Sequence, residues 1–587
     1  MRNRIVLPLA LALAACNASD AVDAGGTSAS DAAVDVGVPD SAGPGTDTST
    51  LPDSAADAAE ATTDAGASAD SGSITDGGTG DATSDAGGDA TTDTGPFIPP
   101  ETSLTPESGA PNMATVAAGW YRGDLHYHTN YSGDAKKQGG DDLATAIAIA
   151  DAFRDPVYLA RYPENAGNGL DFLAITDHRT DEALSDPDFH HDHLILIPGE
   201  EYGSDGHAGI WGLLAHISND VAAGESKNEH HLWAINQAHE QGALFSINHP
   251  VQDTAWLWDT DGIDGVEVWN GPWGTFFGPL TVEQLDEKVA GSGHENIYIR
   301  SAVELSRGGA NHMALLMWYN HLTNGVHIPA VGGGDRHMII PAGLPTTYVL
   351  RPDLPRYEGL EGPALGWEGV VDGLRTGATF VSRSPFGAQV VLEAEDAEGK
   401  RYPMGAELPG PGTYTIHVTV TRAYKGLLRL VTGPIKPQAT KVTAEPMVLA
   451  EDWIPSDRAT GSYEWTVPAG GAWLHAIVLE ELLPEPLPPQ LQDAWAVLSK
   501  MPDGKDIAAI AGALAPILDP NVLLNPKLCN PDDWDPWMLQ CMPADGMTLA
   551  SFYVPDRLER LMNIYFEDGQ ATDWCMGALT SAFMARD

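Results

Sequence analysis

Two histidines, His126 and His128, stand two residues apart in the short apolar run GDLHYH. Alternate side chains of a β-strand point to the same face, so both imidazoles of such a strand can bind one ion. Residues that bind metals also follow several later apolar runs. The full set of candidate ligands is His126, His128, His178, Glu201, His207, His249, Asp335 and His337. Their recurrence at the ends of apolar runs predicts one shared metal site.

This ligand set favours a particular chemistry. Six imidazoles and two carboxylates without a thiolate are typical of sites for zinc, manganese or iron. Eight ligands exceed the four that one tetrahedral ion needs, so we expect two or three divalent ions. Such a cluster supplies a metal-bound hydroxide and clamps the attacking and leaving oxygens. The set therefore predicts hydrolysis of phosphate esters, amides or carbamates.

Three further residues adjoin the candidate ligands and are candidates for catalysis or substrate contact. Asp177 precedes His178, and its carboxylate can orient a neighbouring ligand without binding the ion. Arg179 and Arg336 flank ligands and can grip an anionic group through bidentate contacts. Salt bridges with nearby acids would explain both arginines equally well.

The apolar runs alternate with helical patterns between Trp120 and about His337. Alternation of strands and helices predicts parallel βαβ units. Seven such runs favour a closed, barrel-like α/β arrangement, with an open doubly wound sheet as the alternative. In parallel barrels the carboxyl ends of the strands form the face where active sites are built. The candidate ligands occupy those ends.

The ordered series HxH, TDH, PGxE, GH, NHP and GDxH resembles the motifs of PHP (polymerase and histidinol phosphatase) metallohydrolases. The stretches GDLHYHTNYS, DFLAITDH and VVDGLRTGATFVSRSPFG resemble the CehA/McbA-like branch of that family. The likeness covers about residues 120–390. It implies a distorted seven-stranded (β/α) barrel that holds a trinuclear site and acts as a phosphoesterase or related hydrolase.

The resemblance also distributes the ligands among the ions. It implies that one ion is bound by His126, His128, Glu201 and Asp335, a second by His178 and His337, and a third by His207 and His249 with Glu201 bridging. Relatives often carry a further ligand within a sequence S-D-G soon after the HxH pair. Here the sequence is shifted to SGD, which makes Asp134 an additional candidate ligand.

The chain begins with MRNRIVLPLALALAAC, which is typical of a secretory signal. The ending LAAC resembles a bacterial lipobox and predicts a signal peptide over residues 1–16 with lipid attachment at Cys16. Residues 17–96 contain 15 Asp, 1 Glu and no Lys or Arg, and predict a disordered acidic tether. We expect an exported protein that is lipid-anchored to a membrane, with the outer membrane favoured because Asn17 rather than Asp follows the cysteine.

Three regions follow the tether. The hydrolase barrel is expected over residues 97–384. Alternating β-branched runs predict a small β-sandwich over 385–483. Residues 484–587 are expected to be mainly helical and contain Cys529, Cys541 and Cys575, which allow one disulfide and one free thiol outside the cytoplasm.

The formal net charge of −51 and the lack of a basic patch argue against a nucleic-acid partner. Together these observations predict a metal-dependent hydrolase, most readily a phosphoesterase, that acts on a small anionic ester. An amide, carbamate or ester hydrolase of the same fold is one alternative. A surface-displayed binding protein that keeps its ions without turnover is the other.

Overall fold

The computed structural model describes the body of the chain. The described residues are 101–107, 119–138, 140–151, 169–203, 206–250, 256, 258–271, 310–337, 342–351, 366–385, 387–423, 426–436, 446–481, 534–535, 540–541 and 574–586. The predicted signal peptide with Cys16, the acidic tether and Cys529 lie outside these residues.

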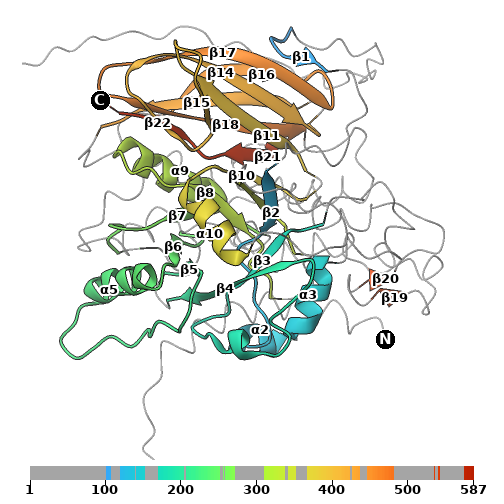
Figure 1. The fold of residues 1–587 in the computed structure, drawn as a ribbon, viewed down its shortest axis with the longest axis vertical. Helices are drawn as coiled ribbons and strands as arrows, with labels where there is room; N and C mark the ends of the chain where they lie inside the picture. The colour runs from blue at the N-terminus through green and yellow to red at the C-terminus, as the bar shows by residue number, and fades with distance from the viewer. Residues whose placement is uncertain are drawn as a thin grey trace, which may run out of the picture. The chain divides into compact units, whose positions relative to one another are not determined.

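Seven apolar runs form strands in the order in which they occur in the sequence (Figure 1). These are β2 (Trp120–Asp124), β3 (Phe172–Ile175), β4 (Ile195–Tyr202), β5 (Ala208–Trp211), β6 (Leu244–Ile247), β7 (Gly265–Asn270) and β8 (Ala330–Gly333). Every residue of these strands is buried. Burial on both faces explains why the runs do not alternate between apolar and polar residues.

The expected seven-stranded (β/α) barrel is wrong, and so is the open doubly wound alternative. β2, β3 and β4 are parallel, and β6, β7 and β8 are parallel, but β5 runs antiparallel to both of its neighbours. The connection 203–207 between β4 and β5 is too short for the crossover that parallel strands need. A tight reversal of the chain therefore replaces one βαβ unit.

The sheet also continues beyond these seven strands. β2 pairs with β9 (Thr346–Leu350), which pairs with β10 (Thr379–Ser382), and the strands belong to one mixed sheet of 15. β9 also contacts β8 through a side chain. Thr347 Oγ1 of β9 accepts a hydrogen bond from the backbone N–H of Gly332 in β8 at 2.9 Å and donates one to the carbonyl of Gly332 at 2.7 Å. The structure is a large curled mixed sheet.

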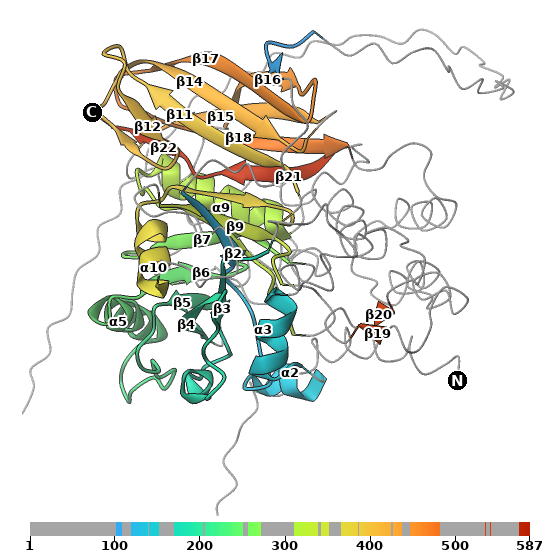
Figure 2. The same ribbon diagram turned by 45° about the vertical axis from the view of Figure 1, so that its right-hand side comes forward.

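The described helices lie against this sheet (Figures 1 and 2). They are α2 (Gly133–Gln138), α3 (Leu143–Asp151), α5 (Lys227–Glu240), α9 (Ala310–Thr323) and α10 (Trp367–Arg375). α5 begins with a capping box, in which Ser226 and Glu229 satisfy each other's backbone N–H groups. α5 packs on β6, α9 on β7, and α10 on β4 and β9. None of the helices in the described ranges is long and apolar enough to span a membrane.

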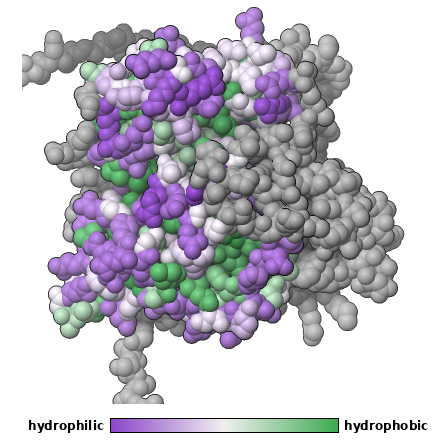
Figure 3. Space-filling model, in the orientation of Figure 1, coloured by the Kyte–Doolittle hydropathy of each residue, from purple (hydrophilic) through white to green (hydrophobic). Residues whose placement is uncertain are grey.

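Two layers of strands follow β2–β10. β11 (Gln389–Glu395), β14 (Gly412–Thr421) and β17 (Arg458–Val467) form a five-stranded sheet with β1 (Thr105–Pro106) and β12 (Arg401–Pro403). β15 (Leu427–Pro434), β16 (Met447–Trp453), β18 (Ala472–Glu481) and the short β13 (Glu407–Leu408) belong to the large sheet. Apolar side chains of both layers share one core. The outer side of β14 and β17 is largely hydrophilic, as Figure 3 shows.

The expectation of a mainly helical C-terminal region is wrong for its described residues. β21 (Trp574–Thr580) pairs with β10 on one side and β18 on the other, and β22 (Phe583–Ala585) pairs with β18 and β13. β19 (Trp534–Asp535) and β20 (Gln540–Cys541) form a separate strand pair. The apolar stretch 574–586 suits a buried position between two strands, and this tertiary context decides its conformation. The other residues of 484–573 lie outside the described part of the chain.

Candidate metal centre

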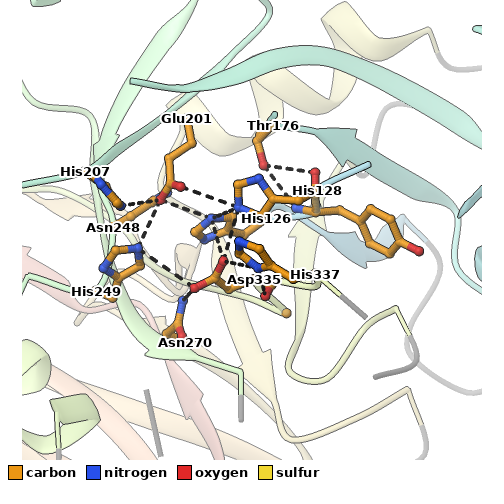
Figure 4. Close-up of polar contacts among 12 residues, drawn as sticks. His126, His128, Thr176, Glu201, His207, Asn248, His249, Asn270, Asp335 and His337 are labelled. Atoms are coloured by element: carbon orange, nitrogen blue, oxygen red, sulfur yellow. Dashed lines mark hydrogen bonds and ion pairs between the residues drawn. The ribbon is translucent and has the colours of Figure 1, made fainter. Parts of the chain in front are cut away.

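The predicted ligands converge at the ends of β2, β3, β4, β6 and β8 and just before β5; Figure 4 labels all of them except His178. Backbone hydrogen bonds join these ends: His128 N donates to Arg336 O at 3.0 Å, and Glu201 N donates to Asp177 O at 3.0 Å. Four overlapping groups of donor atoms, each within 4.8 Å of one another, could hold metal ions: His126, His128, Glu201 and Asp335; His128, His178 and His337; His126, His249 and Glu267; and His178, Glu201 and His207. All eight predicted ligands belong to this one cluster.

Glu201 lies at the centre of the cluster. Its Oε1 atom is 3.1 Å from His126 Nε2, 3.0 Å from His249 Nε2 and 3.4 Å from His207 Nδ1. Its Oε2 atom is 2.9 Å from His178 Nδ1 and 3.4 Å from His128 Nε2. One carboxylate thus faces five imidazoles, which is the position that a bridging ligand requires.

Asp335 faces the same imidazoles from the end of β8. Its Oδ1 atom is 3.1 Å from His128 Nε2, 3.3 Å from His126 Nε2 and 3.5 Å from His337 Nδ1. Its Oδ2 atom accepts a hydrogen bond from Asn270 Nδ2 at 3.2 Å. This bond fixes the carboxylate and leaves Oδ1 directed at the histidines.

Asp134, the additional candidate, joins the cluster from the start of α2. Its Oδ2 atom is 3.0 Å from His178 Nε2 and 3.0 Å from His337 Nε2. The shift from S-D-G to SGD therefore leaves the carboxylate within reach of the histidines, because α2 begins at Gly133 and directs Asp134 toward them.

Five buried polar atoms in this cluster make no hydrogen bond: His178 Nδ1, Glu201 Oε2, His207 Nδ1, His249 Nδ1 and Asp335 Oδ1. Buried polar atoms are nearly always hydrogen-bonded, and each orphan costs about 1–3 kcal/mol. All five belong to predicted ligands. Two of them, His178 Nδ1 and Glu201 Oε2, face each other at 2.9 Å, and Asp335 Oδ1 faces His128 Nε2 at 3.1 Å. The donor set therefore fits one or more divalent cations.

The hydrogen bonds behind the ligands give them the form that a cation needs. His126 Nδ1 lies 3.0 Å from Glu267 Oε1, and His128 Nδ1 lies 3.0 Å from Ser132 Oγ. The two Nε2 atoms then face each other at 3.1 Å. An imidazole that is held in this way through Nδ1 has its Nε2 atom directed toward a metal site.

Electrostatics of the cluster favour bound positive charge. Burial raises the pKa values of Glu201 and Asp335, but the surrounding histidines outweigh this effect and hold both pKa values well below their usual range. Burial, with His337 and His178 nearby, lowers the pKa of His128 to about 3. The carboxylates are thus ionised and His128 is neutral, which are the states in which these groups bind metals.

The three predicted neighbours of the ligands have different surroundings. Asp177 is buried and accepts hydrogen bonds from Thr129 and Ser132, so it supports the ligands from behind. Arg336 is buried, forms an ion pair with Asp141 and lies over the ring of Tyr127. Arg179 has an exposed side chain next to His178.

Sequence reasoning missed several polar residues that hold the ligands. Glu267 Oε1 lies within hydrogen-bond distance of His126 Nδ1, and Glu267 Oε2 accepts a hydrogen bond from the backbone N–H of His249 at 3.0 Å. Asn248 donates to Glu201 Oε1 at 3.0 Å. Asp124 accepts the backbone N–H groups of His126 and Gly334 at 3.0 and 2.8 Å. Glu267 is a carboxylate within the otherwise largely apolar run that forms β7, and that placement was the available signal.

The backbone is strained at the same place. Arg179, His249 and Asp335 adopt positive φ values of 53°, 24° and 46°, and Arg422 is the fourth such non-glycine residue among those described. Each costs of order 1–3 kcal/mol and persists where the surroundings dictate it, which is common at functional sites.

Comparisons of this chain with protein-family models, curated proteins and solved structures found no match.

Proposed function

We propose that this protein is a metal-dependent hydrolase that holds two or three divalent ions and acts most readily as a phosphoesterase. The observation that carries the proposal is the set of five buried donor atoms without hydrogen bonds, all on predicted ligands. The order of the motifs, which resembles that of PHP metallohydrolases, supports the reaction class. No single ion can satisfy four donor groups that span nine residues.

The candidate ligands group around the carboxylates of Glu201 and Asp335. Glu201 and Asp335 would be shared among ions because each faces at least three imidazoles. Asp134 would join His178 and His337. Bound ions of zinc, manganese or iron would supply an activated water and stabilise the charge on the oxygens of an ester.

Exposure indicates from which side a substrate would approach. The side chains of His126 and Glu201 are 1% and 0% exposed, whereas those of His178, His207 and Asp134 are 12%, 14% and 21% exposed. The cluster therefore opens toward His178. Arg179, exposed beside it, is placed to attract an anionic ester. Burial on the opposite side excludes water and keeps the ligands in place.

The test is a metal analysis combined with a substrate screen. Protein purified without chelators should contain at least two equivalents of zinc, manganese or iron, and should hydrolyse p-nitrophenyl phosphates faster than aryl carbamates or esters. Asp335→Asn should lower both metal content and turnover, the latter by about 100-fold or more. His417→Ala, which changes a half-buried histidine of β14 paired with Glu395, should change neither.

Three results would count against the proposal. Fewer than two equivalents of metal would refute the cluster. Faster hydrolysis of carbamates than of phosphate esters would show that the protein is a carbamate hydrolase rather than a phosphoesterase. Full metal content without hydrolysis of any ester, amide or carbamate would show that it is a binding protein rather than an enzyme.

A further inference from the structure

We propose that Ser132 is a positioning residue, whose hydroxyl fixes His128 in the tautomer that binds metal. This inference rests on the proposed metal-binding function and deepens it. Ser132 lies between the ligand-bearing ends of β2 and β3, and it is completely buried. It is not a candidate ligand, because its hydroxyl is occupied on every side by protein groups.

The hydroxyl hydrogen of Ser132 decides which ring nitrogen of His128 carries a proton. A serine hydroxyl has one hydrogen to donate and two lone pairs that accept. Ser132 Oγ donates to Asp177 Oδ1 at 2.9 Å and accepts the backbone N–H of His178 at 2.9 Å. His128 Nδ1 lies 3.0 Å from the same oxygen. Since the hydrogen is already committed to Asp177, His128 Nδ1 must be the donor.

Asp177 holds the hydroxyl in this orientation. Its Oδ1 atom also accepts the backbone N–H groups of Thr129 and Ser132, at 2.7 and 3.2 Å. These donors cannot be reversed, so Oδ1 acts as an acceptor and draws the Ser132 hydrogen toward it. Its Oδ2 atom accepts the hydroxyl of Thr129 at 2.7 Å. Asp177 therefore acts on His128 only through Ser132.

The consequence appears on the other side of the imidazole ring. With its proton on Nδ1, His128 presents an Nε2 lone pair, and this atom lies 3.1 Å from Asp335 Oδ1 and 3.4 Å from Glu201 Oε2. The opposite tautomer would place a proton where an ion must bind. The same hydroxyl also anchors the backbone of His178, so it orients ligands from two strands.

The decisive comparison is between two hydroxyls on the same carboxylate. Ser132→Ala should weaken Zn²⁺ binding by about 10- to 100-fold in competition with a chromophoric chelator. Thr129→Val removes a buried hydroxyl from Asp177 but leaves the Ser132 bridge, and should retain wild-type affinity within about threefold. Ser226→Ala removes the helix-capping hydroxyl of α5 and should also leave Zn²⁺ binding unchanged.

The outcomes separate this inference from the proposed function. Wild-type protein that binds none of Zn²⁺, Mn²⁺ and Fe²⁺ would overturn both. Wild-type binding with equal affinity in Ser132→Ala, or with an equal loss in Thr129→Val, would overturn the role of Ser132 alone. The ¹⁵N NMR spectrum of metal-free wild-type protein tests the inference without any substitution. His128 should carry its proton on Nδ1 in this spectrum. A proton on Nε2 would refute the inference.

Discussion

Replacement of Gly333 by alanine should displace the candidate metal ligand His126 without changing any polar group. Gly333 ends β8 and lies directly against β2. A Cβ atom added there would lie 2.3 Å from the Cβ of His126, 2.9 Å from its backbone nitrogen and 3.0 Å from Glu267 Oε1. Ordinary contacts of Cβ atoms begin at 3.4 Å. Either His126 or the end of β8 must therefore move by about 1 Å.

A displacement of this size is large for the metal centre. His126 Nε2 lies 3.1 Å from Glu201 Oε1, and its Nδ1 is held by Glu267 at 3.0 Å. A shift of about 1 Å breaks both contacts, and misplacements of about 1 Å cost on the order of 100-fold in activity. We expect Gly333→Ala to lose about 100-fold in turnover and to bind fewer equivalents of metal.

The assay measures Zn²⁺ equivalents, Zn²⁺ affinity and hydrolysis of p-nitrophenyl phosphate, together with the urea midpoint of the metal-free protein. Gly412→Ala in β14 is the matched control, because an added Cβ meets no atom within 4 Å there. Full metal content with Zn²⁺ affinity within threefold of wild type would show that the close packing of β8 on β2 does not position His126.

Three further predictions concern the stability of the fold. Burial lowers the pKa of His475 to about 3, so below its ordinary pKa of 6.5 the unfolded chain binds a proton that the folded protein does not bind. Between about pH 7.5 and pH 5, the unfolding free energy of wild type should therefore fall by about 2 kcal/mol more than that of His475→Gln. Equal losses in urea titrations would contradict this. Thr347→Val leaves the N–H and C=O of Gly332 without their side-chain partner and should cost about 2 kcal/mol in urea unfolding, whereas exposed Thr413→Val should cost almost nothing. Deletion of residues 574–587 exposes the facing edges of β10 and β18 and should abolish the cooperative transition; a monomeric deletion variant with the wild-type midpoint would disprove the importance of β21.

The candidate site was largely predictable from the sequence because each ligand is tied to a local pattern. His126 and His128 follow an apolar run, as do His178, Glu201 and Asp335, and strands of a curled sheet bring such ends together. Ser132 and Asp124 were not predictable in this way. Their importance depends on hydrogen bonds to backbone groups 46 and 210 residues away, which leave no spacing pattern.

The strands were predictable, whereas most of their arrangement was not. The reversal at β5 could have been predicted, because the connection 203–207 is too short to contain a crossover. The pairing of β21 could not: its apolar sequence suits a helix or a strand equally, and the space between β10 and β18 decides its conformation. Long-range pairing of this kind depends on partners that a local window of sequence does not contain.

The position of β21 has a consequence for the route by which the protein folds. Thr379 and Ser581 share a hydrogen bond at 2.6 Å although 202 residues separate them. β21 follows both of its partners in the chain, so the facing edges of β10 and β18 stay unpaired until β21 joins them. Loop closure over this distance is entropically slow, and such contacts dominate folding times. Assembly of the ligand-bearing strands and the sandwich strands into one cooperative unit therefore depends on this long-range pairing.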